Sequence, residues 1–231
     1  MESILYGFYI AEMTQQITCI CLLLDESGSM GTIKDSVKRS ILECKQKLSA
    51  DGECYFSLYT FSSGNEDINN TLIIKIDYIN SDEEFEFDYL PGGMTGLYDA
   101  QMAGVNRLYH KIKNLPKPHQ PNKVVFVTVT DGEENDSCIY NSTEVKTKIQ
   151  YLQDTEQWQF VYLGANQDSF DSARQLGVSG GGTQNYVASD EGISLVMRNV
   201  SRAISAYRTS TSTTVDMHHI LDDDDDDAAA V

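Results

Sequence analysis

The sequence predicts an α/β fold: a doubly wound, mostly parallel sheet with one antiparallel edge strand and helices on both faces. Strand-like and helix-like segments alternate along the chain, which is typical of sheets with crossover helices. Three strand-like segments, Ile17–Leu24, Lys123–Thr130 and Trp158–Gly164, are nearly continuous apolar runs. Such runs are expected of strands covered on both faces. A chain of 231 residues is long enough to bury one core of this kind.

The first half of the chain supplies the edge of the sheet. After the first apolar run, apolar residues recur with helical spacing over Ile33–Leu48. Two strands are expected next, Cys54–Phe61 and Thr71–Ile76, and their short connection predicts an antiparallel pair. The acidic segment Asp82–Leu90 has alternating aromatic residues, so it is either an edge strand or a loop with aromatic anchors.

The second half continues the alternation. Helices are expected before and after the strand at Lys123–Thr130, over Leu97–Lys113 and Thr143–Leu152. The strand at Trp158–Gly164 is followed by a short helix at Asp168–Gly177, a brief strand at Asn185–Val187 and a long helix over Glu191–Tyr207.

The domain boundaries follow from composition. We expect an N-terminal extension over residues 1–14, one domain over residues 15–208, and a disordered tail over residues 209–231. The tail begins with a Ser/Thr run and contains six consecutive aspartates, Asp222–Asp227, so it has little apolar surface to bury. The aspartates are either a solvated end or a segment that binds cations or a basic partner.

Charge and cysteine content narrow the function. The net charge of −18 opposes binding to phosphate backbones and to anionic membranes. No apolar run reaches the roughly 18 residues of a membrane span, and the N-terminus lacks the basic region of a signal peptide. The five cysteines are an odd number without framework spacing, which favours reduced thiols and a cytoplasmic location.

Oxygen-bearing side chains follow the two inner strands. Asp25 ends the first apolar run and Asp131 ends the run at Lys123–Thr130. In open α/β sheets, ligands bind at the carboxyl ends of the strands. After Asp25, the alternate residues Ser27 and Ser29 carry hydroxyls. Carboxylate and hydroxyl oxygens are hard donors that suit Mg²⁺, Mn²⁺ or Ca²⁺.

Helix capping is the simpler explanation for the hydroxyls in this segment. Ser29 or Thr32 would cap the helix expected from Ile33. Capping does not explain Asp25, because a carboxylate at the end of a buried strand would be an unpaired charge.

Three segments together resemble the von Willebrand factor A domain with its metal-ion-dependent adhesion site (MIDAS). The segment from Asp25 to Ser29 is similar to the first motif of that site, "GGMTGLYDA" to the second and "VTVTDGEEN" to the third, in the order of the family. The resemblance covers Ile17–Tyr207, and "FVYLGANQDSFDSARQLGVS" and "NYVASDEG" are similar to stand-alone bacterial and phage-type members. The metal ligands that the resemblance implies are Asp25, Ser27, Ser29, Thr95 and Asp131.

The resemblance implies a three-layer fold and a protein-binding module without catalysis. In the family, an acidic side chain of a partner fills an open coordination position of the bound ion, which here would be Mg²⁺ (or Mn²⁺ or Ca²⁺). A protein partner that offers an Asp or Glu carboxylate is implied, such as an AAA+ ATPase or another complex subunit. The residues expected to form the partner-binding rim are Glu26, Met30, Gly93, Glu133, Glu134 and Asn135.

The alternative is a metal-dependent hydrolase or phosphatase that uses the same ion. It requires a general acid or base near the metal, and the four histidines, at positions 110, 119, 218 and 219, lie outside the three motifs. Glu26 and Glu133 are the remaining candidates. The Gly-x-Ser-x-Gly match at Gly177–Gly181 follows an expected helix and not the strand that a nucleophile elbow needs. The sequence therefore favours a binding module.

Overall fold

A six-stranded sheet forms the centre of the computed structural model, which describes residues 17–64, 66–80, 83–165 and 169–218. The strands are β1 (Thr18–Asp25), β2 (Cys54–Phe61), β3 (Ile73–Asn80), β4 (Lys123–Thr130), β5 (Gln159–Ala165) and β6 (Thr183–Tyr186). They are arranged in the order β3-β2-β1-β4-β5-β6. All neighbours are parallel except β2 and β3. The predicted fold class, including its antiparallel edge strand, is confirmed.

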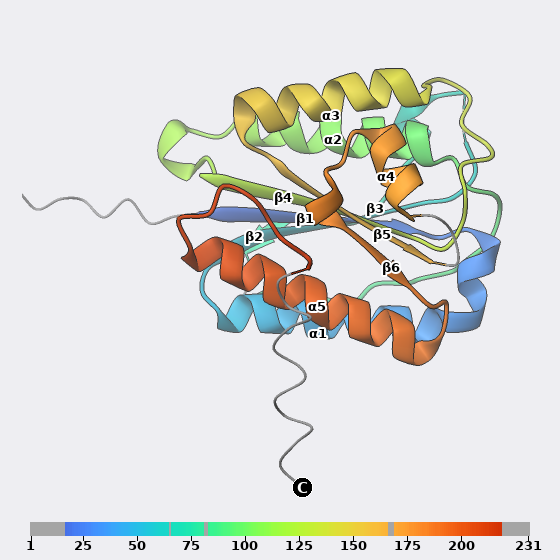
Figure 1. The fold of residues 1–231 in the computed structure, drawn as a ribbon, viewed down its shortest axis with the longest axis horizontal. Helices are drawn as coiled ribbons and strands as arrows, with labels where there is room; N and C mark the ends of the chain where they lie inside the picture. Colours follow the sequence, from blue (N-terminus) through green and yellow to red (C-terminus); the bar gives the residue numbers. More distant parts are fainter. Residues whose placement is uncertain (1–16, 65, 81–82, 166–168, 219–231) are drawn as a thin grey trace, which may run out of the picture.

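Helices cover both faces of the sheet, which gives the molecule three layers (Figure 1). The helices are α1 (Lys34–Ala50), α2 (Leu97–Lys113), α3 (Ser142–Glu156), α4 (Ser169–Leu176) and α5 (Asp190–Thr209). Helices α1 and α5 lie on one face, and α2, α3 and α4 lie on the other. Short 3₁₀ turns lie at η1 (Gly28–Ile33), η2 (Ile68–Asn70), η3 (Lys117–His119) and η4 (Gly180–Gly182).

Strand β1 shows why the apolar runs are continuous. All eight of its residues are buried. Successive side chains of a strand point to opposite faces, so Ile20 and Leu22 join the core under α1 and α5, whereas Cys19 and Cys21 join the core under α2 and α3. A central strand with helices on both sides thus has no solvent-facing position.

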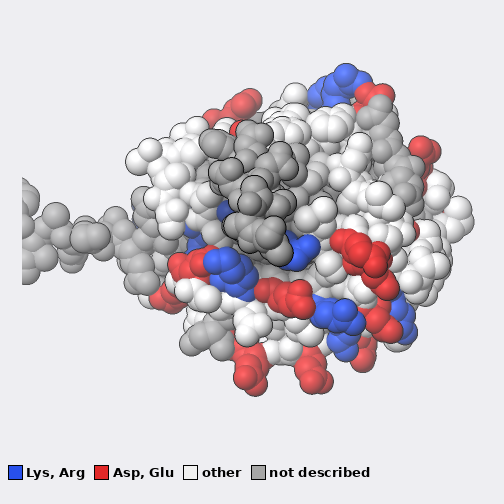
Figure 2. All heavy atoms as spheres, turned by 60° about the horizontal axis from the view of Figure 1, so that its bottom comes forward, with Lys and Arg blue, Asp and Glu red and all other residues white. Residues whose placement is uncertain are grey.

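The surface formed by α1 and α5 carries both signs of charge. Figure 2 shows Lys and Arg side chains interspersed with Asp and Glu on this face. A basic patch of the kind that binds a phosphate backbone is therefore not found there. In the part of the chain that the structure describes, no helix combines the length and the apolar composition needed to cross a bilayer.

Up to residue 218, the chain after α5 packs onto the domain, whereas the sequence predicts a disordered tail there. Val215 and Met217 are buried in the core under α1 and α5, and the Met217 N–H donates to the Gly181 carbonyl (2.8 Å). Two apolar side chains thus fold a Ser/Thr-rich segment back onto the domain. Residues 219–231 and the predicted extension, residues 1–14, lie outside the described residues.

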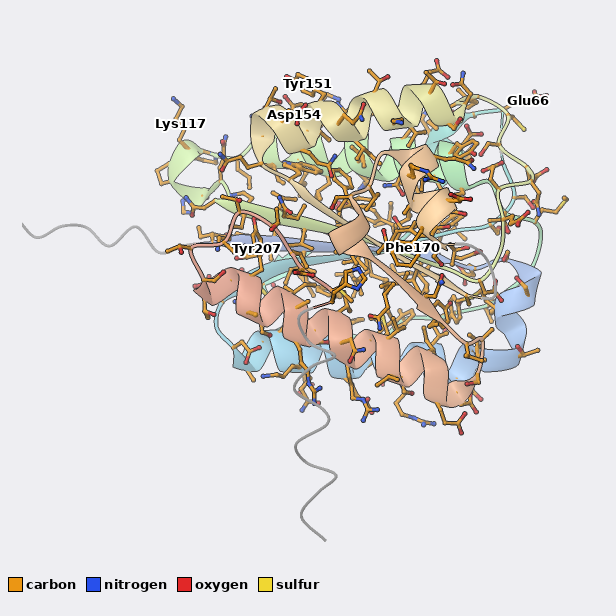
Figure 3. All side chains as sticks on the ribbon, in the orientation of Figure 1. Glu66, Lys117, Tyr151, Asp154, Phe170 and Tyr207 are labelled. Carbon is orange, nitrogen blue, oxygen red and sulfur yellow. The ribbon has the colours of Figure 1, made fainter. Side chains whose placement is uncertain are left out.

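Lys123 fixes the end of α5, from which this segment starts. Its ammonium group donates to the carbonyls of Tyr207 and Ser210 and lies 4.4 Å from the ring centre of Tyr207, which is labelled in Figure 3. A cation at the C-terminal end of a helix is favoured by the helix dipole. The turn after α5 is therefore held by the first residue of β4.

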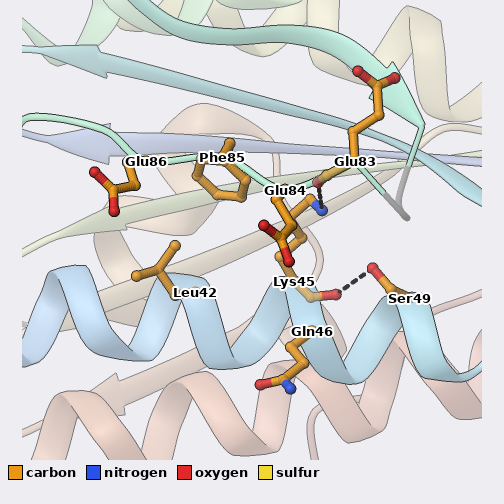
Figure 4. A pocket seen from close by; sticks show the side chains of 8 residues that line it. All are labelled: Leu42, Lys45, Gln46, Ser49, Glu83, Glu84, Phe85 and Glu86. Atoms are coloured by element: carbon orange, nitrogen blue, oxygen red, sulfur yellow. Dashed lines mark hydrogen bonds between the residues drawn. The ribbon is translucent and has the colours of Figure 1, made fainter.

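The segment from residue 83 to residue 90 is a loop with aromatic anchors. Phe87 and Tyr89 are buried, and Lys45 of α1 donates to the Glu83 carbonyl and lies 5.3 Å from the ring centre of Phe85. A cavity of about 590 Å³ lies beside these contacts, between the loop and α1 (Figure 4). Because the polar contact closes the loop onto α1, we attribute this hollow to loop packing.

Candidate metal centre

The candidate site lies at the carboxyl edge of the sheet, where three loops that are distant in sequence meet. The Gly28 N–H donates to the Gly93 carbonyl (3.1 Å), and the Asn135 N–H donates to the Thr95 carbonyl (3.1 Å). These bonds join the loop after β1, the loop before α2 and the loop after β4. The three motif segments of the sequence are thereby brought together.

Asp25 is a fully buried carboxylate. Its Oδ1 accepts from the Ser27 N–H (2.7 Å) and its Oδ2 accepts from the Thr130 hydroxyl (2.6 Å). Burial raises the pKa of Asp25 to about 6, although the hydrogen bonds from Thr130 and Ser27 oppose the rise. Among the residues that the structure describes, no Lys or Arg forms an ion pair with Asp25.

The two serines link Asp25 to the aspartate after β4. The Ser27 and Ser29 hydroxyls are 3.2 Å apart, and the Ser29 hydroxyl donates to Oδ1 of Asp131 (2.6 Å). Burial also raises the pKa of Asp131, and the bond from Ser29 lowers it. Four of the predicted ligands thus form one continuous group of oxygens.

Thr95 completes the group from the loop before α2. Its side chain is buried and faces the backbone of Gly132. A β-carbon placed on Gly132 would lie 3.1 Å from Oγ1 of Thr95 and 4.0 Å from Oδ2 of Asp25. The space between these oxygens is therefore kept open by the absence of a side chain at position 132.

The chemistry of these donors fits a hard divalent cation. Two carboxylates and three hydroxyls offer only oxygen, the donor preferred by Mg²⁺, Mn²⁺ and Ca²⁺. Within the described ranges, no group of three or more His, Cys, Asp or Glu side chains is placed to hold a metal ion. The candidate set does not need such a group, because most of its donors are hydroxyls. That these residues bind a metal stays a prediction.

The helix-cap explanation for the hydroxyls is wrong. Helix α1 begins after Ile33 with no side-chain cap. The Ser29 hydroxyl is turned to Asp131, and the Thr32 hydroxyl reaches only the Ser29 carbonyl at 3.5 Å. The η1 turn, which sequence patterns do not reveal, separates these hydroxyls from the start of α1.

The predicted rim does not hold for Glu26 and Met30, because both are buried. Oε1 of Glu26 accepts from the Leu90 N–H (2.6 Å) and from Nζ of Lys75 (3.2 Å). The Glu26 carbonyl accepts from the Gly92 N–H (2.8 Å). Glu26 therefore anchors the loop that carries Thr95 and is not available to a partner.

Glu134 also departs from the predicted rim. Its carboxylate accepts from the Tyr98 N–H (2.9 Å) at the start of α2 and from the N–H and hydroxyl of Ser137 (both 2.7 Å). Free N–H groups at a helix start attract a carboxylate, which explains the inward turn. The rim residues that remain exposed are Gly93, Glu133 and Asn135.

Sequence reasoning missed Asp99, which organises the loop after β4. It is fully buried in the first turn of α2 and accepts from the N–H groups of Cys138 (2.7 Å), Ile139 (3.1 Å) and Tyr140 (2.7 Å). In sequence, an acid in the first turn of a helix is ordinary, so only the structure reveals this contact. Thr130 was missed for a similar reason, since a strand-end threonine is common.

Comparison with known proteins identifies the family of folds to which this structure belongs. No family model and no curated protein matches the sequence. The PilB minor pilin from Streptococcus sanguinis matches with a TM-score of 0.54 at 13% identity, over 83% of this chain and 62% of that one. A von Willebrand factor type A structure from Catenulispora acidiphila matches with a TM-score of 0.60 at 11% identity, over 83% of this chain and 43% of that one. The fold is that of a von Willebrand factor A domain.

A third structure is relevant to the site of this A-domain fold. Proximal thread matrix protein 1 from the mussel byssus, with a zinc-occupied MIDAS motif, matches with a TM-score of 0.53 at 15% identity, over 83% of this chain and 46% of that one. The chain thus spans between 43% and 62% of the length of these three structures. Identities this low support the fold alone, so the metal centre rests on the geometry of this chain.

Proposed function

We propose that this A domain binds a divalent cation, Mg²⁺ in the first place, and uses it to capture an acidic side chain of a protein partner. The observation that carries the proposal is the 2.6 Å contact between the Ser29 hydroxyl and Asp131. It joins the motif after β1 to the aspartate after β4, directly beside the buried carboxylate of Asp25. The residues that would hold the ion are Asp25, Ser27, Ser29, Thr95 and Asp131.

The electrostatics of the site favour this use. A bound cation would supply the positive charge that Asp25 and Asp131 lack among the described residues, and it would attract one further carboxylate. The chain itself positions the oxygens: Thr130 and the Ser27 N–H orient Asp25, and the anchored loop before α2 presents Thr95. Mn²⁺ and Ca²⁺ accept the same donors.

The partner and the location belong to the same proposal. Gly93, Glu133 and Asn135 are the exposed rim residues, and by analogy with the family the partner is a protein such as an AAA+ ATPase or another complex subunit. None of the five cysteines is in a disulfide, and four of them are buried. Cysteines that form no disulfide support a reducing, cytoplasmic compartment.

A metal-dependent hydrolase is not favoured by any specific contact. Of the two candidate general bases, Glu26 is buried and bound to Lys75 and Leu90, and Glu133 is an exposed loop residue. His110 lies near the end of α2 and His119 in η3, while His218 contacts the carbonyl of Gly180. We therefore propose binding without catalysis.

Calorimetric titration with Mg²⁺, Mn²⁺, Ca²⁺ and Zn²⁺ tests the metal site. We expect Ser29→Ala to weaken Mg²⁺ binding at least tenfold and Asp25→Asn to abolish it. Thr32→Ala is the matched control, because its hydroxyl lies in the same segment without contacting Asp131. Partner capture with and without EDTA then tests the interface. Equal metal affinity in the wild type and Asp25→Asn would overturn the proposal.

A further inference from the structure

Two large apolar side chains stand in solvent beside the metal centre. Leu90 is 71% exposed and Met94 is 49% exposed, and both belong to the loop that carries Thr95. The loop is fixed at both residues: the Leu90 N–H donates to Glu26 (2.6 Å) and the Met94 N–H donates to the Ser63 hydroxyl (3.0 Å). Two exposed apolar side chains on one anchored loop offer apolar contacts to a ligand that binds at this edge of the sheet.

The chemistry of a matching ligand follows from these neighbours. A carboxylate would bind the cation, and an apolar side chain next to it would cover Leu90 and Met94. Without the cation, a strongly acidic ligand would be repelled, because Asp131 and the exposed Glu133 lie at the site and the chain carries a net charge of −18. Binding of such a ligand would therefore depend on the metal.

The chain itself contains a segment of this chemistry. Ile220 and Leu221 are followed directly by the six aspartates Asp222–Asp227. We propose that Ile220–Asp227 of one copy of this protein occupies the metal site of a second copy, with an aspartate on the cation and the apolar pair against Leu90 and Met94. This inference rests on the metal-dependent function proposed above.

The last described residue lies too far from its own site for the apolar pair to reach it. The ring of His218 stacks on Phe170 of α4 (6.1 Å between centres) and its Nε2 lies 3.2 Å from the Gly180 carbonyl; Phe170 is labelled in Figure 3. His218 thus lies beside the β6 edge, three strands from β1. Three strand spacings amount to about 14 Å.

The sheet register adds a second component to this separation. Leu24 is level with Val129, Val129 with Leu163 and Leu163 with Gln184. Gly180 lies four residues before Gln184, or about 10 Å along the chain. The direct path is then about 17 Å, whereas the three residues from His218 to Leu221 span about 11 Å at most. A second copy has no such limit.

Such contacts are head-to-tail, because the tail and the site are different surfaces. A heterologous contact of this kind gives open chains or closed rings, and the smallest ring is a dimer in which two copies exchange tails. We expect the wild-type protein to self-associate in Mg²⁺, with a mass that rises with protein concentration, and to be monomeric in EDTA. Sedimentation velocity over a hundredfold concentration range measures both states.

A complementation experiment isolates the two surfaces. One full-length variant has Asp222–Asp227 all replaced by Asn, and the other carries Asp25→Asn. Each variant alone should remain monomeric in Mg²⁺. Their mixture should form a one-to-one heterodimer and nothing larger, because only one productive contact exists between them. Self-association of either variant alone would overturn the proposal.

The apolar part of the contact has its own test. Leu90→Ser should weaken Mg²⁺-dependent association about tenfold and leave Mg²⁺ affinity unchanged. Leu195→Ser is the matched control, because Leu195 is 47% exposed on α5. Equal effects of the two substitutions would contradict a role for Leu90.

Failure of this inference is distinguishable from failure of the metal site. If the variant with asparagines at 222–227 binds Mg²⁺ but the wild type stays monomeric at all concentrations, the tail proposal is overturned and the metal function stands. If the wild type binds no metal, both are overturned. A monomer in which Mn²⁺, which is paramagnetic, broadens the NMR signals of Asp222–Asp227, and in which Asp25→Asn removes that broadening, would assign the tail to its own site and reject the second copy.

Discussion

At the scale of a single residue, the proposed metal binding would be coupled to pH through the carboxylate of Asp25. Its pKa of about 6 lies above the ordinary value near 3.9, so the folded state binds the proton more tightly than the unfolded state. Without metal, stability therefore falls as pH rises from about 4 to above 6, by up to about 3 kcal/mol from this group. Burial shifts the pKa of Asp131 in the same direction.

A bound cation should offset the loss of stability that ionised Asp25 causes at higher pH. We expect Mg²⁺ to stabilise the protein strongly at pH 7.5 and weakly at pH 5, where protons compete for Asp25. Asp25→Asn should raise the metal-free stability at pH 7.5 by about 1–3 kcal/mol and remove the response to Mg²⁺, because an amide still pairs with Ser27 and Thr130. Urea unfolding at both pH values, with and without Mg²⁺, measures these differences. A metal response that does not change with pH would contradict the assignment.

Gly132 offers a second residue-scale test. A β-carbon there would lie 3.1 Å from the Thr95 hydroxyl, so Gly132→Ala should crowd the space between Thr95 and Asp25. We expect about tenfold weaker Mg²⁺ binding in calorimetry and little change in the urea midpoint. Gly92→Ala is the control, because nothing lies within 4 Å of its added carbon. Equal metal affinity in both variants would show that the cation does not use this space.

The residue scale also shows what the sequence can and cannot predict. The oxygens of Asp25, Ser27 and Ser29 were predicted because alternate positions after a strand share a direction. The burial of Met30 and the inward turn of Glu134 were not, because both depend on where the η1 turn and the start of α2 lie in space. Contacts between loops leave no periodic signal in the chain.

At the scale of elements, Glu26 connects the edge strand β3 to the loop that carries Thr95. Its carboxylate binds Lys75 of β3 and the Leu90 N–H. Glu26→Ala should cost about 1–3 kcal/mol and release the loop, so that Mg²⁺ binding weakens and the Leu90 amide exchanges faster. Glu26→Gln keeps an acceptor for that amide.

Hydrogen exchange at the Leu90 amide separates the two variants. We expect protection to be lost in Glu26→Ala and retained in Glu26→Gln, while both lose the ion pair with Lys75. Urea unfolding provides the stability of each. Faster exchange in both variants would assign the anchoring to the ion pair instead of the hydrogen bond.

The sequence predicted the bounds of an element correctly where a single pattern, either a buried apolar run or an amphipathic stripe, covered the whole element. β2, β4 and α2 have the predicted bounds, because each is a buried run or a clean amphipathic stripe. β3 begins later and extends to Asn80, beyond the predicted Ile76, with register shifts against β2 and a positive φ at Tyr78. An edge strand is half-exposed and irregular, so its alternation is too weak to fix its ends.

For the molecule as a whole, composition misplaced the end of the domain. The segment from residue 209 is rich in Ser and Thr, and a rule based on mean hydropathy treats it as a tail. Yet Val215 and Met217 fill the core under α5. The mean hydropathy of this segment is hardly changed by two apolar residues. Their side chains nevertheless fill positions that a densely packed core needs.

This difference leads to a test of domain extent. Met217 is fully buried, so Met217→Ala should lower the free energy of unfolding by about 2–4 kcal/mol. Thr213→Ala, at an exposed position of the same segment, should change it by less than about 0.5 kcal/mol. Urea unfolding of the full-length chain measures both. If Met217→Ala is as mild as Thr213→Ala, the segment does not contribute to the core and the domain ends with α5. A large loss places the boundary after residue 217, so any variant that removes the aspartate run must keep Met217 for its effect on assembly to be separable from unfolding.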